Sequence, residues 1–392
     1  MNSGPAPAIA YLAQGRIRVK NGNEAPRTIE SVFGNSIREK AVRAQQQNSW
    51  KSGGNDGSPF SRAIWGKAGM TGQEIPLMIT SICSSRETGS LIYSLESDSL
   101  CALLEVSQLG AEERRLWNDN RTQLRHVSLS RATGNLVFSV LHQNGTANIG
   151  VKLAGEGGYK ELTEGDSFDT APRWVPGPET KIVFQSAGIG RNERGQFAAL
   201  GPFSLQQLDT ETGEMTMLLE DPKFDYLAPL MLADGRLLYI RRPWSGQHRV
   251  NPFHVLKDIV FFPFRLAYAF FQFLNFFSAM FTGRKLTSAG GPKGQDMDMK
   301  QMMIWGNLVR ARQPARTEEE GTDLVPKTWE LQCRTASGET RTLASGVLAY
   351  DTNAEGGIIF TNGNAVTLLR PDGRKERILN EHMIQQVFFL PG

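Results

Sequence analysis

Cysteine and histidine are scarce in this chain of 392 residues, which contains three cysteines and five histidines. Cys83, Cys101 and Cys333 are too few and too far apart to build a disulfide framework. The sequence has no Cys-x-x-Cys pair and no His-x-x-x-His pair that would suit a zinc ion. We therefore expect no metal site and no cofactor, and a reducing compartment fits this cysteine usage.

Catalytic motifs are also missing. The sequence has no Gly-x-Ser-x-Gly elbow, and the Gly-Ile-Gly stretch at 188–190 lacks the third glycine of a dinucleotide-binding loop. Aspartates near expected strand ends are interpreted as residues that cap turns: Asp98, Asp119, Asp166, Asp169, Asp225 and Asp351. We therefore assign no catalytic residue and predict that the protein is not an enzyme.

Strong charge and a secretory signal are absent too. The formal net charge is only +3, which does not favour nucleic acid as a partner. The first seven residues have neither a basic segment nor an apolar one, and Arg16 and Arg18 follow soon after. We expect a chain without a signal peptide that resides in the cytoplasm.

Glycine and proline are plentiful, with 40 and 19 residues, and they separate short apolar segments. Those segments recur in groups that read as four strands joined by turns. Five such groups occupy residues 76–118, 126–166, 168–221, 225–346 and 347–380. Residues 8–32 supply three more strands, and 382–390 supply the fourth. We predict an all-β fold: one domain over 8–392, a six-bladed β-propeller closed by one blade shared between the termini.

One group carries a resemblance to a known family. Residues 169–176 read Asp-Thr-Ala-Pro-Arg-Trp-Val-Pro, and the apolar stretch 181–186 follows. This order resembles the WD-like repeat of TolB-type six-bladed propellers. The resemblance implies a propeller used mainly for protein contacts. The export signal and the separate N-terminal domain of TolB have no counterpart here, so periplasmic residence and the partners of TolB are not expected.

Long insertions interrupt the repeat at 33–75, 188–202 and 241–326, all on the same expected face of the propeller. The first should contain a short amphipathic helix at 36–47 and a flexible linker at 51–59. Ile-Trp-Gly occurs in two of the insertions, around Trp65 and Trp305. These tryptophans either pack as apolar anchors or bind a partner protein. We expect function on this face, because binding residues gather on insertions.

The segment 253–281 in the third insertion is the most unusual part of the chain, since it holds ten of the 21 phenylalanines. Its polar residues are spaced mainly by three, four or seven, which predicts one polar stripe on a helix that Pro263 kinks or breaks. The apolar remainder favours an in-plane membrane helix. Its predicted membrane-binding residues are Phe253, Phe261, Phe262, Phe264, Phe270, Phe271, Phe273, Phe276, Phe277, Phe281, Arg284 and Lys285.

Two other interpretations of this segment stay open. A membrane-spanning helix needs roughly 20 apolar residues, and the run after Arg265 is shorter and contains Gln272 and Asn275. A buried helix or an oligomer interface could use the same apolar face. Between residues 241 and 300, cations outnumber anions by six, so the basic surplus lies beside the phenylalanines. An anionic lipid surface would attract it.

Our leading hypothesis from the sequence is a non-catalytic propeller scaffold, docked on the cytoplasmic side of a membrane, that holds or recruits partner proteins. One alternative is a soluble subunit of a larger assembly, whose Phe-rich helix forms a protein interface. The other is a propeller enzyme with a site at the central channel. The sequence does not define an oligomeric state.

Overall fold

The structure is a computed structural model, and it describes residues 6–49, 77–97, 100–107, 110, 112–120, 122–177, 180–244, 301–304, 307–310 and 323–390. The chain divides into two compact units. The first consists of residues 1–39, 75–246 and 302–392 and contains every four-stranded sheet. In the second, residues 40–74 and 247–301, mainly the stretch 40–49 is described.

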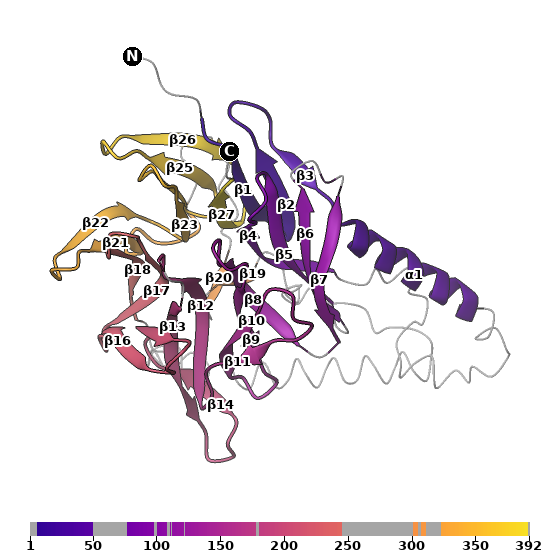
Figure 1. The fold of residues 1–392 in the computed structure, drawn as a ribbon, viewed down its shortest axis with the longest axis horizontal. Coiled ribbons are helices and arrows are strands. Elements are labelled where there is room, and N and C mark those ends of the chain that lie inside the picture. Colours follow the sequence, from indigo (N-terminus) through magenta and orange to yellow (C-terminus); the bar gives the residue numbers. More distant parts are fainter. Residues whose placement is uncertain are drawn as a thin grey trace, which may run out of the picture. The chain divides into compact units, whose positions relative to one another are not determined.

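The described part is almost entirely β-structure, arranged in small antiparallel sheets (Figure 1). The first sheet has the order β27 (Ile384–Phe389), β1 (Ile9–Ala13), β2 (Arg16–Lys20), β3 (Arg27–Ile29). The second consists of β4 (Met78–Ser84), β5 (Ser90–Ser97), β6 (Leu100–Ser107) and β7 (Glu113–Asp119). A third sheet consists of β17 (Phe224–Met231), β18 (Leu237–Pro243), β21 (Glu330–Arg334) and β22 (Thr340–Ser345). A fourth consists of β23 (Ala349–Thr352), β24 (Ile358–Thr361), β25 (Ala365–Leu369) and β26 (Lys375–Asn380).

A nine-stranded sheet lies between these in the sequence and combines two antiparallel groups. The first group is β8 (Gln123–Leu129), β9 (Leu136–Leu141), β10 (Ala147–Lys152) and β11 (Lys160–Glu161). The second is β12 (Ser167–Trp174), β13 (Lys181–Arg191), β15 (Ser204–Asp209) and β16 (Met215–Leu219), with β14 (Phe197–Leu200) paired to the end of β13. A parallel contact of β10 with β12, at Ala147 and Phe168, joins the groups. None of the described sheets closes on itself.

Burial is lowest in the last strand of each sheet group, and the first strands β4, β17 and β23 are less buried than the strands that follow them. We call all strands of a group except the last its inner strands. Nearly all residues of β5 and β6 are buried, whereas the outer strands β7, β16 and β26 are largely exposed or half-buried. A strand buried on both faces needs apolar side chains at successive positions, as in Leu91-Ile92-Tyr93. The sheets therefore pack against one another through both faces of their inner strands.

Apolar clusters connect each sheet group to the next one in the sequence. One large cluster joins the sheets of β1, β4 and β8, with Leu12, Leu103 and Phe138 among its members. Further clusters join β9 and β10 to β13, β15 to β18, and the sheet of β17 to that of β23. A last cluster joins the sheet of β23 to β1 and β27, through Ile359 and Val387. Each sheet group thus shares buried side chains with two neighbours.

The first strands of three groups contain a bulge with a left-handed residue. His126, Ala171 and Ala228 have φ angles of 53°, 53° and 49°, and the pairing with the next strand shifts at each position. A bulge releases a backbone N–H from the ladder, which then needs another acceptor. The Ser81 hydroxyl accepts from Val127 N at 2.8 Å, and the Gln185 amide oxygen accepts from Ala228 N at 2.7 Å. Neighbouring groups are therefore also linked by polar contacts.

The terminal strand pairs with the first strand of the chain, as predicted from residues 382–390. Strands β27 and β1 lie side by side (Figure 1), with Ile9 opposite Phe389 and Tyr11 opposite Val387. Leu390 N donates to Ala8 O at 3.0 Å and extends the pairing. The two ends of the chain thus belong to one sheet.

The helix predicted at 36–47 is longer in the structure, where α1 runs over Val32–Ser49. Its start is set by Ser31, whose hydroxyl accepts from Gly34 N at 2.9 Å in the manner of an N-cap. The Glu113 carboxylate accepts from Phe33 N at 2.5 Å. Because these two acceptors satisfy N–H groups of the first turn, the helix begins earlier than its apolar pattern indicates.

The insertions are partly described. The one predicted at 188–202 is a β-hairpin, because β13 continues to Arg191 and pairs with β14. In the third, β18 continues to Pro243 and β21 begins at Glu330, so the connection runs over 244–329. It contains a two-stranded sheet of β19 (Gln301–Ile304) and β20 (Asn307–Arg310).

Candidate functional site: polar groups on the inner strands

The membrane-binding and partner-binding residues predicted from the sequence lie outside the described residues. These are Phe253, Phe261, Phe262, Phe264, Phe270, Phe271, Phe273, Phe276, Phe277, Phe281, Arg284, Lys285, Trp65 and Trp305. Their roles stay predictions. Within the described segments, the structure contains no helix that combines the length and the apolar character needed to cross a membrane.

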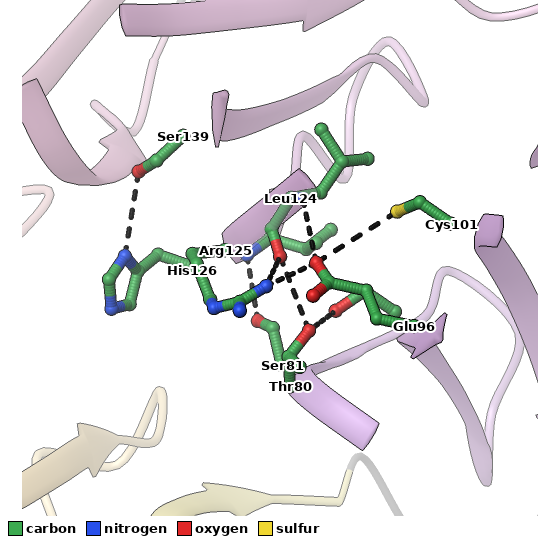
Figure 2. Close-up of polar contacts among 10 residues, drawn as sticks. Thr80, Ser81, Glu96, Cys101, Leu124, Arg125, His126 and Ser139 are labelled. Carbon is green, nitrogen blue, oxygen red and sulfur yellow. Dashed lines mark hydrogen bonds and ion pairs between the residues drawn. The ribbon is translucent and has the colours of Figure 1, made fainter. Parts of the chain in front are cut away.

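Glu96 on β5 is the centre of a polar cluster between two sheets (Figure 2). It is buried, with 8% of its surface exposed, and it accepts from Leu124 N at 2.8 Å. It also forms an ion pair with Arg125, whose side chain is 29% exposed. Leu124 and Arg125 both belong to β8. One buried carboxylate thus holds the backbone and a side chain of the neighbouring sheet, which offsets the cost of its burial.

Hydroxyl groups extend this cluster. Thr80 Oγ1 lies 2.7 Å from Ser94 Oγ and donates to Leu124 O at 3.2 Å. The Cys101 thiol lies 4.0 Å from Glu96 Oε1. Burial, followed by the charge of Glu96, raises the pKa of Cys101 to about 12, so this thiol stays protonated and is a poor nucleophile. The cluster as a whole joins β4, β5, β6 and β8.

His126 follows Arg125 in the chain, but its ring points the other way. Figure 2 shows the imidazole directed away from Glu96, with Nδ1 3.5 Å from Ser139 Oγ on β9. Burial lowers the pKa of His126 to about 3, and the charges of Arg125 and Arg173 add to this effect. The imidazole is therefore neutral at physiological pH, and it is too weak a base for proton transfer near neutrality.

Asp225 and Arg242 form a second buried polar centre, with exposed side-chain fractions of 3% and 5%. Arg242 Nε lies 2.8 Å from Asp225 Oδ2, and its guanidinium lies 4.6 Å from the centre of the Trp329 ring. Asp225 Oδ1 also accepts from Phe203 N at 2.9 Å. This ion pair therefore joins β17 and β18 to the chain that leads into β15.

The expectation that aspartates cap turns fails for the three buried ones. Besides Asp225, Asp169 accepts from Ser186 Oγ at 2.6 Å, and Asp351 accepts from Phe389 N at 2.9 Å. Burial raises the pKa of both Asp169 and Asp351. These carboxylates form hydrogen bonds between strands because the inner strands are shielded from solvent. Asp119 does take the expected role and accepts from Thr122 Oγ1 at 2.6 Å.

These buried polar groups therefore serve mainly to hold neighbouring sheet groups together. Across the described segments, no three His, Cys, Asp or Glu side chains come together as metal ligands would. Sequence reasoning missed Glu96 and Arg125 because they stand 29 residues apart in no motif. The only signal was a charged residue inside each expected strand, which usually indicates a solvated face rather than a buried pair.

No family model matches the chain, and no curated protein does. The structure is similar to a crystal structure of TolB from Acinetobacter baumannii, with a TM-score of 0.52 and 12% identity, over 100% of this chain and 69% of that chain. It is also similar to a chain in a crystal structure of the nidogen/laminin complex, with a TM-score of 0.50 and 7% identity, over 98% of each chain. The chain therefore has a TolB-like β-propeller fold at low sequence identity, and identity this low shows the fold alone.

Proposed function

We propose that this protein is a non-catalytic β-propeller scaffold that holds partner proteins. The observation that carries this proposal is the use of the buried charged groups on the inner strands. Glu96, Asp225 and Asp351 each accept a backbone N–H from a neighbouring sheet group, and Arg125 and Arg242 are paired to two of them. Residues that an enzyme would direct toward a substrate here hold the scaffold together.

The scaffold is a ring of six blades. Support comes from the apolar clusters, which link each sheet group to the next and the last group back to the first. The nine-stranded sheet counts as two blades, since a single parallel contact joins its two antiparallel groups. The pairing of β27 with β1 then closes the ring within one blade.

The ring docks on the cytoplasmic face of a membrane through residues 253–281, lying in the plane of the interface. Support comes from the sequence: ten phenylalanines, one polar stripe and an excess of four positive charges over residues 243–300. Arg241 and Arg242, just before this stretch, are paired with Glu330 and Asp225. Full burial of one phenylalanine contributes about 1.5–3 kcal/mol. Hydrophobic insertion should therefore dominate, while charge, screened by salt within about 8–10 Å, should mainly orient the protein.

Vesicle flotation tests the docking. Wild-type protein should float with vesicles of phosphatidylcholine and phosphatidylserine, and high salt should not release it. A variant with Phe270, Phe271, Phe273, Phe276 and Phe277 changed to Ser should stay in solution with an unchanged melting temperature. The matched charge variant, Arg284→Glu with Lys285→Glu, should only lose its preference for the anionic vesicles. Wild-type protein that stays off the vesicles, or leaves them in high salt, would refute membrane docking.

A deletion separates the docking segment from the scaffold. Residues 245–300 are replaced with a short Gly-Ser linker, starting after Trp244 so that Arg242 keeps its ion pair with Asp225. Loop length changes closure entropy only slowly, so the shortened protein should remain soluble with a similar melting temperature. If it unfolds, the segment belongs to the core and the proposed docking role is wrong.

A further inference from the structure

Arg173 occupies an unusual position on the first strand of its sheet group. It lies near the end of β12, and its residue is half-buried. Its guanidinium lies 5.0 Å from the centre of the Phe388 ring. Phe388 belongs to β27, in the sheet formed by the two ends of the chain, so the side chain of Arg173 reaches a sheet remote from its own in the sequence. An aromatic face holds a guanidinium by a cation–π contact and leaves its N–H edges available.

The charge of Arg173 is not matched by a carboxylate. Among the described residues, no Asp or Glu lies within ion-pair distance of its guanidinium, and no protein acceptor receives a hydrogen bond from it. The other half-buried or buried arginines of the inner strands are paired, Arg125 with Glu96 and Arg242 with Asp225. A guanidinium carries five donors in a planar fork. No nitrogen of Arg173 is both buried and without a partner, so the fork is open to water.

The positive charge of Arg173 acts on titratable side chains from several sheets. Burial raises the pKa of Cys83 on β4 to about 12, and the positive charge of Arg173 opposes that rise. Burial also raises the pKa of Asp351 on β23, opposed first by Arg173 and, more weakly, by Arg131. The carboxylate of Asp351 is occupied by Phe389 N at 2.9 Å. His126 on β8 is neutral, because burial lowers its pKa to about 3.

These neighbours leave a positive region that lacks a direct counter-ion. Cys83 and His126 are uncharged at neutral pH. The Asp351 carboxylate is buried and accepts from Phe389 N, and it forms no ion pair with Arg173 in the described chain. A planar guanidinium fork matches the paired oxygens of a carboxylate or a phosphate, and such charge-assisted bonds are stronger than those between neutral groups. The position is half-buried rather than closed, so a small ligand can approach from water.

We propose that Arg173 binds a small-molecule oxyanion, a carboxylate or a phosphate, at the ends of the first strands, with Phe388 holding the guanidinium in place. The oxyanion accepts from the N–H edge of the fork and completes the charge balance that the described chain leaves open. This role does not depend on membrane docking, because the residues that carry it lie on the inner strands.

Titration calorimetry at pH 7 tests the site with two probes, inorganic phosphate and succinate, which distinguish the two classes of oxyanion. Wild-type protein should bind at least one of them with a stoichiometry of one. Arg173→Gln should weaken that affinity by about tenfold or more, the loss expected for one hydrogen bond to a charged group. The matched control is Arg194→Gln, which removes an exposed arginine that has no ion pair in the described chain, and it should bind as wild type does.

A second variant keeps the test valid if Arg173→Gln fails to fold. Arg173→Lys retains the positive charge but not the planar fork, so it should fold and bind more weakly than wild type. Absence of binding to both probes by the wild-type protein would overturn the proposal. Equal affinity of the wild type and of either Arg173 variant would overturn it too, because the oxyanion would then sit elsewhere.

Discussion

Acid should destabilise this protein through His126, whose neutral imidazole is enclosed between the inner strands. Its pKa is about 3 in the folded chain, against an ordinary value of 6.5. As the pH falls below 6.5, the unfolded chain therefore takes up a proton that the folded chain refuses until about pH 3. Unfolding becomes more favourable over this window, so the stability present above pH 6.5 is lost as the pH falls. Between pH 7 and pH 5 the loss from this one group is about 2 kcal/mol.

The test is urea unfolding of the wild type and of His126→Asn at pH 7 and pH 5. Asparagine does not titrate and tolerates the left-handed φ of 53° at this position. Wild-type protein should lose about 2 kcal/mol more than the variant between the two pH values. His382→Asn, at an exposed position, is the control and should lose as much as the wild type. Equal losses for the wild type and His126→Asn would refute the neutral, enclosed imidazole.

Two further predictions concern the buried charges. Arg242→Met leaves Asp225 buried without its partner and should lower the free energy of unfolding, measured by thermal melting, by about 3–5 kcal/mol. The control is Arg374→Met, at the exposed pair with Asp372. It should lower the free energy of unfolding by no more than about 1 kcal/mol. Asp351→Asn keeps an acceptor for Phe389 N and removes a carboxyl whose pKa is raised by burial. The free energy of unfolding of the variant should exceed that of wild type at pH 7. This gain should fade as the pH falls through the raised pKa of Asp351 toward the ordinary value of 3.8, below which the carboxyl is protonated in both the folded and the unfolded chain. A gain that is the same at pH 3 and pH 7 would contradict this.

Much of the strand pattern could be predicted from the sequence, because turns and apolar alternation are local. The pairing of residues 382–390 with the first strand followed from counting strands, and the structure places β27 beside β1. The helix start at Val32 was missed because the apolar pattern begins later than the cap. The first turn is held by the Ser31 hydroxyl and by Glu113, a residue remote in the sequence. The hairpin of β13 and β14 was predicted only as a loop between strands.

The polar contacts between sheets could not be predicted in the same way. Glu96 meets Arg125 only because two sheets pack together, and nothing in the local sequence of either strand shows this. The same holds for Arg173 and Phe388, which come from strands 215 residues apart. The aspartates were expected at turns because short polar residues usually gather there. Because the inner strands are buried, Asp169, Asp225 and Asp351 instead accept hydrogen bonds from other strands and from the chain that leads into β15.

Removal of the terminal strand tests the closed ring most directly. β27 and the residue after it bury five apolar side chains, Ile384, Val387, Phe388, Phe389 and Leu390. At about 1.5–3 kcal/mol each, they are comparable to the whole free energy of unfolding of a typical domain, about 5–15 kcal/mol. A chain that ends at residue 381 should therefore aggregate or melt far below the wild type, whereas a chain that ends at 390 should melt as the wild type does. A soluble chain ending at 381 with an unchanged melting temperature would contradict the ring.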